Sequence, residues 1–305
     1  MAAVSEPQVP LGPQPVDLRE PPGWRRTKSQ IMTVLMWFAF VVVLIPLGFV
    51  LYTVIEKGAG AISWQFLTNG TIPPNVLPLG TGGMGAAVIG TLEVTGFAAL
   101  LAIPLGVLGA VYISEYGGQS WLAKLIAFMS DVMTGVPSIV MGLFIYTLWV
   151  LHFGYSGMAG SFALACLMLP LVIRSSYEML RLVPDSLREG SYALGSTKSR
   201  VTMTVVLPAA VGGIVSGALL AIARAAGETA PLIFTIAIVE QTNTNLFSGP
   251  NTALPVQIFN NAQSPYVGAQ ARAWGAALTL IAIVFIVMIV ARIVTAFFTR
   301  YTREG

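Results

Sequence analysis

Charged side chains are scarce in this chain. Asp, Glu, Lys and Arg make up 10 % of its 305 residues, whereas soluble domains carry roughly 25 %. Hydrophobic residues make up 55 %, and the mean hydropathy is +0.78. This composition excludes a soluble globular enzyme. The apolar runs are continuous rather than alternating, which excludes a β-barrel and predicts membrane-spanning helices of about 20 residues each.

Cysteine and histidine are nearly absent, with one residue of each. Cys166 has no partner for an intrachain disulfide, and His152 alone cannot supply a zinc site. The phosphate-binding pattern G-x-x-x-x-G-K-[ST] is also missing, because residues 195–199 lack the first glycine and the Gly-Lys order. We therefore expect no catalytic residues, no metal site and no cofactor bound by this chain.

Six apolar runs predict an all-α polytopic protein. The predicted spans cover residues 31–55, 86–113, 132–151, 154–173, 209–239 and 274–298. Together they define a transmembrane domain over residues 31–300. Residues 1–30 contain six prolines and almost no apolar run, which predicts a disordered cytoplasmic tail.

The positive charges favour one side of the predicted membrane. Of the 16 Lys and Arg residues, 13 lie on the side of the N-terminus, 12 of them in tails and loops and Arg292 in the inner part of the sixth predicted span. Only Lys57 and Arg272 fall in loops on the other side, and Arg224 lies within the fifth predicted span. Cytoplasmic loops carry such an excess, so both termini are predicted to be cytoplasmic. The basic pI of about 9.1 then reflects topology, and no nucleic-acid partner is expected.

The loop over about residues 174–208 holds most of the polar chemistry. Pro184 and Asp185 predict the start of a short helix, with Asp185 as its N-cap, and Gly195 predicts its end. The result is a helix-turn-helix presented to the cytoplasm. An ordinary solvated loop is the alternative interpretation.

The spacing of residues in this loop carries a resemblance to the permease subunits of bacterial ABC importers. Their cytoplasmic loop has the pattern E-A-A-x3-G-x9-I-x-L-P, with small residues here in place of the two alanines. The matching positions are Glu189, Gly190, Ser191, Gly195, Val205, Leu207 and Pro208. The resemblance implies the type I ABC importer permease fold and a loop that docks onto a cytoplasmic ATPase subunit.

Arg224 lies near the middle of the apolar segment 209–239, and Glu228 follows one helical turn later on the same face. An Arg at a helix centre costs about 2.5–3.5 kcal/mol on insertion, so it requires a partner or a cavity. A guanidinium suits oxyanions because it donates to two oxygens at once. Arg224, Glu228 and Arg174, at the inner end of the fourth span, are therefore candidates for an anion pathway. A self-satisfied structural pair at 224 and 228, and an Arg174 that snorkels at the interface, are the alternatives.

Residues 223–232 (ARAAGETAPL) and 173–176 (IRSS) narrow the resemblance to the phosphate-importer permeases of the PstA type. The likeness covers roughly residues 31–300. It implies that Arg224, Glu228 and Arg174 belong to a phosphate pathway across a bacterial plasma (inner) membrane. It also implies three kinds of partner: a homologous second permease subunit (PstC-type), a dimer of ATPase subunits (PstB-type) that binds ATP and Mg, and an extracytoplasmic phosphate-binding protein (PstS-type).

Two other functions remain open at this point. An ABC permease for sulfate, molybdate or a phosphonate would share the docking loop and the intramembrane arginine. A non-ABC channel or ion-coupled carrier would transport without a separate ATPase.

Overall fold

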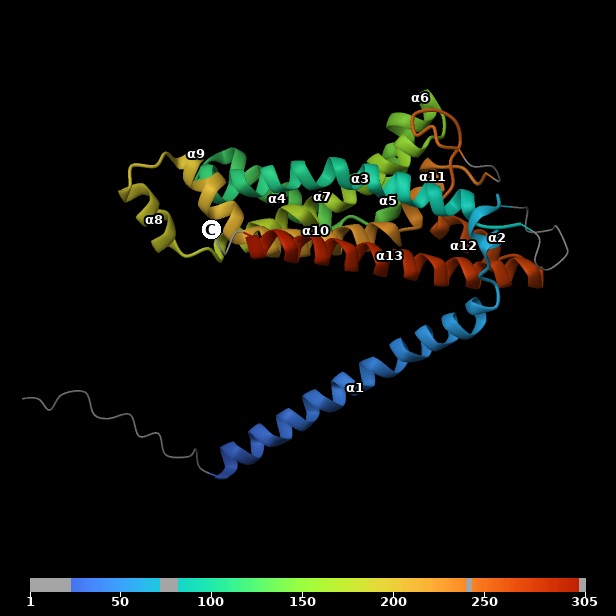
Figure 1. Cartoon of the computed structure of the whole chain (residues 1–305), viewed down its shortest axis with the longest axis horizontal. Helices are drawn as coiled ribbons and strands as arrows, with labels where there is room; N and C mark the ends of the chain where they lie inside the picture. Colours follow the sequence, from blue (N-terminus) through green and yellow to red (C-terminus); the bar gives the residue numbers. More distant parts are fainter. Residues whose placement is uncertain (1–22, 72–81, 240–242, 302–305) are drawn as a thin grey trace, which may run out of the picture. The chain divides into compact units, whose positions relative to one another are not determined.

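The computed structural model describes residues 23–71, 82–239 and 243–301 (Figure 1). Its regular structure in these residues is helical throughout. The chain divides into two compact units, Met1–Tyr52 and Thr53–Gly305. The described part of the first unit is the greater part of helix α1 (Gly23–Ala59). Residues 23–30 of the predicted tail are thus helical, since Arg, Lys and Gln favour helix, and residues 1–22 lie outside the described part.

Among the described residues, five helices are long and apolar enough to cross a membrane, and a bent pair adds a sixth. This matches the predicted number of spans, although no membrane is present to place them. The five are Arg26–Ala59, Gly85–Gly117, Gly157–Arg181, Lys198–Ala226 and Val267–Ile293. The transmembrane domain over residues 31–300, with its loop at 174–208, stays a prediction.

Two of these five spans combine several elements. The second span is α3 (Gly85–Val111) continued by the π-helical turn η1 (Tyr112–Gly117). The fourth is α7 (Gly157–Arg181). The fifth comprises α9 (Lys198–Val201), η3 (Thr202–Val206) and α10 (Leu207–Ala226). The last is α13 (Val267–Tyr301).

The third predicted span, over 132–151, corresponds to a bent pair of helices and not to a single helix. It comprises α4 (Trp121–Gly135), then α5 (Ser138–Ile145), η2 (Tyr146–Val150) and α6 (Leu151–Phe153). The two halves meet at 107°. Pro137 explains the break, because a residue that precedes proline is pushed out of the helical region, and Val136 is extended with ψ of 127°.

The fifth span begins and ends earlier than predicted, at Lys198 and Ala226, and the predicted segment 209–239 is not one helix. Helix α10 ends at Ala226 with Gly227 as its cap, and the short helix α11 (Ala230–Thr235) follows with a proline in its first turn. Proline lacks the N–H that would continue the upstream helix. Pro231 is therefore placed where a new helix begins rather than inside an old one.

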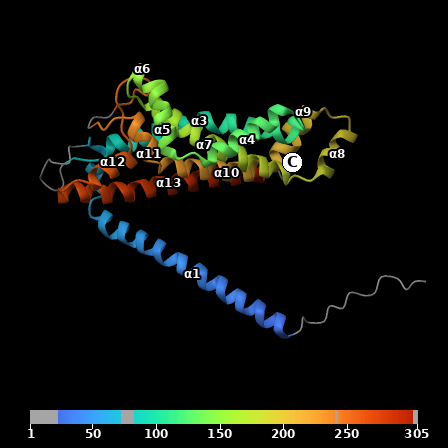
Figure 2. The ribbon, with the colours of Figure 1, turned by 180° about the vertical axis from the view of Figure 1, so that it is seen from behind.

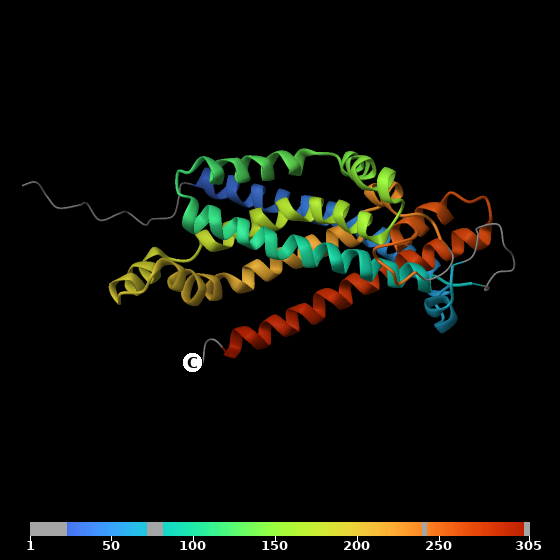
Figure 3. The ribbon, with the colours of Figure 1, turned by 90° about the horizontal axis from the view of Figure 1, so that it is seen from above.

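Helices α3, α7 and α10 form the centre of the second unit, as the view from above shows (Figure 3). Their shared core includes the fully buried side chains of Val94, Leu164 and Met168. Small residues allow the close approach. The Ser161 hydroxyl of α7 donates to the Val94 carbonyl of α3 at 3.0 Å, which joins two neighbouring spans through the backbone.

Several short helices lie at the two ends of this unit. Helices α2 (Trp64–Thr68) and α12 (Leu254–Ala262) lie at one end, and α8 (Asp185–Ala193) and α9 lie at the other (Figures 1 and 2). The predicted polar loop is therefore displayed at one end of the bundle.

Candidate functional site

Helix α8 is the centre of the predicted docking loop. It begins at Asp185, which is the first helical residue and not the N-cap, so that detail of the prediction is wrong. Pro184 occupies the cap position because its fixed φ suits the entry to a helix. The Asp185 carboxylate accepts from the Arg188 guanidinium at 3.1 Å instead of capping the backbone.

Gly195 ends α8, as the sequence predicts. Its φ is +79°, in the left-handed region that glycine adopts without steric cost. Its N–H donates to the Tyr192 carbonyl at 2.9 Å, and the Ser196 N–H donates to the Ser191 carbonyl at 3.2 Å. This pair of bonds is a Schellman motif, so the turn between α8 and α9 has a defined geometry.

The surface of α8 is open. None of its residues is buried, and Glu189 and Gly190 are exposed. Large apolar side chains are exposed on and beside it: Leu182, Leu187, Tyr192 and Leu194, the last with 88 % of its surface accessible. Several large apolar side chains exposed on one short helix and its flanks are typical of an interaction surface.

The rest of the predicted motif lies in the following span. Ser191 is half-buried, and its hydroxyl donates to the Leu187 carbonyl at 2.9 Å. Leu207 is half-buried at the start of α10 and packs on a buried cluster that includes Val206, while Pro208 is exposed. Residues 189–195 of the predicted motif thus lie together in the second half of α8 and the turn that follows it, whereas Leu207 and Pro208 lie at the start of α10.

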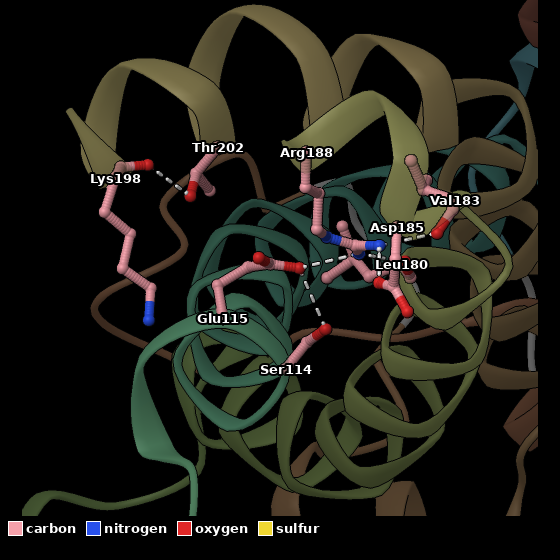
Figure 4. Close-up of polar contacts among 8 residues, drawn as sticks. All are labelled: Ser114, Glu115, Leu180, Val183, Asp185, Arg188, Lys198 and Thr202. Carbon is pink, nitrogen blue, oxygen red and sulfur yellow. Dashed lines mark hydrogen bonds and ion pairs between the residues drawn. The ribbon is translucent and has the colours of Figure 1, made fainter. Parts of the chain in front are cut away.

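Sequence reasoning missed the strongest polar interaction of this region. The Arg188 guanidinium pairs with the Glu115 carboxylate at 3.0 Å, and their side chains are only 14 % and 6 % exposed. Figure 4 shows Arg188 of α8 pointing toward Glu115 of η1, with Ser114 beside it. The two residues are 73 positions apart, so no local pattern could reveal the pair.

Arg224 lies in the last turn of α10, not near the middle of a longer helix as predicted. Its Nε lies 3.5 Å from Oε1 of Glu228, which confirms that the two residues meet. The Arg224 side chain is 66 % exposed and that of Glu228 is 20 % exposed. A guanidinium so exposed on a membrane-spanning helix requires water or another protein surface around it.

Arg174 lies elsewhere in the bundle. It bonds Asp131 of α4 at 3.2 Å and Glu178 of its own helix at 2.9 Å. Arg174 and Asp131 border a cavity of about 310 Å³. Gly213 and Gly217 of α10 lie against Met179 and Ser175 of α7, respectively. The two helices therefore run antiparallel. In this register, Arg224 lies about 9 Å along the helix axes from the level of Arg174. Among the described contacts, none joins Arg174 to Arg224 or Glu228.

The matched family model agrees with this architecture. Residues 102–301, which include the docking loop and Arg224, match the model described as the binding-protein-dependent transport system inner membrane component. The chain therefore belongs to this family of membrane subunits of ABC transporters, which work with ATPase and substrate-binding partners.

Curated relatives define the branch. The phosphate transport system permease protein PstA 1 of Mycobacterium tuberculosis is 41 % identical over 307 residues, covering 99 % of this chain and 96 % of the relative. PstA of Yersinia pestis is 42 % identical over 279 residues, covering 91 % and 93 %. Within the family, the chain is a member of the PstA group of multi-pass permeases.

A solved structure shares the fold. The inward-facing MetNI methionine ABC transporter matches with a TM-score of 0.54 at 20 % identity, covering 70 % of this chain and 96 % of that one. The all-α arrangement of the second unit is thus that of the ABC importer permeases.

Proposed function

We propose that this chain is one permease subunit of an ATP-driven importer of inorganic phosphate. It forms half of the pathway, and a homologous second permease subunit forms the other half. A dimer of ATPase subunits holds ATP and Mg, and an extracytoplasmic phosphate-binding protein delivers the substrate. The chain itself makes and breaks no covalent bond of the substrate.

The observation that carries this proposal is the exposed turn around α8. It matches the importer signature in spacing, it is not covered by any other described part of the chain, and it displays leucine side chains to a partner. The full-length similarity to phosphate permeases supports phosphate as the cargo.

The pathway is assigned to Arg224 and Glu228, with Arg174 nearer to α8. The break after Ala226 leaves Arg224 at a helix end with an exposed guanidinium. Broken spans in transporters place polar groups at substrate sites. Glu228 neutralises part of the charge, so that phosphate can be held and also released.

The orientation of the chain in the membrane follows from the proposed docking of α8 onto the ATPase. The ATPase lies in the cytoplasm, so α8 and both termini face that side, in line with the excess of Lys and Arg on it. The membrane concerned is the bacterial plasma membrane.

Reconstitution tests this function. Vesicles containing the chain, the second permease and the ATPase, with binding protein and labelled phosphate on the side opposite to α8, should transport phosphate only when ATP is supplied on the α8 side. Omission of the ATPase should abolish transport, whereas a channel or ion-coupled carrier would retain it. Excess sulfate, molybdate or phosphonate should leave uptake unchanged, and strong competition by one of them would transfer the assignment to that oxyanion.

Gly195 provides a test of the coupling loop. Replacement by Val should lower the phosphate transported per ATP several-fold, because a β-branched residue is strained at a φ of +79° and the turn that orients α8 would change. Nothing lies within 4 Å of a Cβ at this position, so steric crowding is not the cause. Gly195→Asn is the matched control, because Asn tolerates the left-handed region, and it should couple nearly normally. Equal coupling in the Val and Asn variants would contradict the role of the turn.

A further inference from the structure

We propose that Arg188 and Glu115 form a positioning clamp that transmits movement of α8 to the second and fourth spans. The inference rests on the proposed function, since it concerns how force from an ATPase reaches the pathway. Neither residue contacts the substrate; both act through the helices that they join.

The two carboxylates that bind the Arg188 guanidinium differ in burial. Asp185 and Glu115 both accept from the Arg188 guanidinium, at 3.1 and 3.0 Å, but the Asp185 side chain is 87 % exposed and that of Glu115 is 6 % exposed. An exposed ion pair is screened by water and contributes little. A buried pair is different, because separating the two charges would leave each of them desolvated and unpaired. The Glu115 contact therefore resists separation, and the Asp185 contact does not.

Three structural elements meet at the Arg188 side chain. The Arg188 guanidinium also donates to the Leu180 carbonyl at 2.9 Å and to the Val183 carbonyl. Leu180 lies in the last turn of α7, where carbonyls lack partners within the helix and carry partial negative charge. One guanidinium thus joins α8, the end of α7 and the η1 turn that continues α3, as Figure 4 shows.

Helix α8 makes few other side-chain contacts with the rest of the described structure. None of its residues is buried. Within the described structure, the side-chain hydrogen bonds that join α8 to other helices are all made by Arg188, whereas the Ser191 hydroxyl bonds within α8. A displacement of α8 by a docked partner therefore passes through this guanidinium, through the contact of α8 with η3, or through the chain connections at either end of the helix.

The consequence follows from the packing of α3 and α7. Both spans contribute to the central buried cluster, in which Val94 and Ala98 of α3 lie with Leu164 and Met168 of α7. Close-packed interiors transmit displacement rather than absorb it. A clamp that holds the ends of both spans would move them together when α8 moves.

The chemistry requires arginine at position 188. Four acceptors surround the guanidinium: two carboxylates and two carbonyls. Its planar set of five donors can serve them together, whereas a lysine ammonium has three donors at a single point. Glu115→Gln keeps the size and one accepting oxygen but removes the charge that holds the guanidinium.

The experiment compares Glu115→Gln with Asp185→Asn in the full reconstituted complex, with Arg188→Lys as a third variant. Phosphate uptake and ATP hydrolysis are measured in the same vesicles, and the ATPase retained by the purified complex is quantified. We expect Glu115→Gln and Arg188→Lys to retain the ATPase and hydrolyse ATP, with phosphate transported per ATP lowered about tenfold. Asp185→Asn, which removes the exposed carboxylate from the same guanidinium, should keep the phosphate transported per ATP within about twofold of the unmodified complex, whatever its effect on docking.

Each other outcome is decisive. A proportional fall in uptake and hydrolysis, with an unchanged ratio, would overturn the clamp, as would an equal loss in Asp185→Asn. Loss of the ATPase from the Glu115→Gln complex would assign the pair to assembly and would also overturn it. Failure of the proposed function is separate, because it would appear as absence of ATP-dependent phosphate uptake in the unmodified complex.

Discussion

Replacing Arg224 with Gln is expected to lower ATP-dependent phosphate uptake about 10- to 100-fold. The estimate follows from the loss of charged hydrogen bonds to an oxyanion, which contribute about 1.5–3 kcal/mol. The Arg224 guanidinium is 66 % exposed and only loosely paired with Glu228 at 3.5 Å, so its donors are free to serve a ligand. Uptake is measured in reconstituted vesicles with the amount of assembled complex held equal.

Two controls separate a substrate contact from a general loss of positive charge. Lys124→Gln removes an exposed cation from α4 and should leave uptake unchanged. Arg224→Lys keeps the charge but loses the planar fork, so it should retain part of the activity. Normal uptake by Arg224→Gln would remove this residue from the pathway.

The second large effect is expected at Gly106, where α3 and α7 approach closely. A Cβ at this position would lie 2.7 Å from Cγ1 and 2.8 Å from Cβ of Val172. The latter atom is attached directly to the backbone of α7 and cannot move aside. Gly106→Leu should therefore cost about 3 kcal/mol or more through overpacking, and little folded protein should be recovered from detergent by size-exclusion chromatography.

Gly96 supplies the control on the same helix. It has nothing within 4 Å of a Cβ, so Gly96→Leu should leave the isolated chain folded, and replacement of glycine inside a helix gains about 1 kcal/mol of propensity. Equal recovery of the two variants would show that the α3–α7 contact is looser than the atomic distances indicate.

The membrane spans were predictable because hydrophobic runs of sufficient length have few alternatives in a bilayer. Their interruptions were harder to predict. Pro137 and Pro231 are visible in the sequence, yet a proline inside an apolar run can kink a helix, bend it sharply or start a new one. The choice depends on what packs against the break, and a single sequence does not contain that information.

The turn between α8 and α9, in contrast, was predictable from the sequence. Gly195 and the residues around it act locally, so their spacing alone predicts the end of α8. The partner of Arg188 is set by tertiary structure, because Glu115 reaches it only after α3 and α7 have packed side by side. The pairing of Arg224 with Glu228, one helical turn apart, is predicted correctly, but the position of Arg224 near the middle of a helix is not, because the helix ends at Ala226.

The 107° bend of the third span has a consequence for the subunit on its own. The break lies about 22 Å along α4 from its first residue. The Thr134 hydroxyl donates to the Asp131 carbonyl at 2.6 Å and so solvates one of the carbonyls there. Other peptide groups at the break still need a hydrogen-bonding environment, and acyl chains offer none. If the bent pair crosses the bilayer as one span, a single copy of this chain would expose unsatisfied peptide groups to lipid. A second subunit or water must then surround the break.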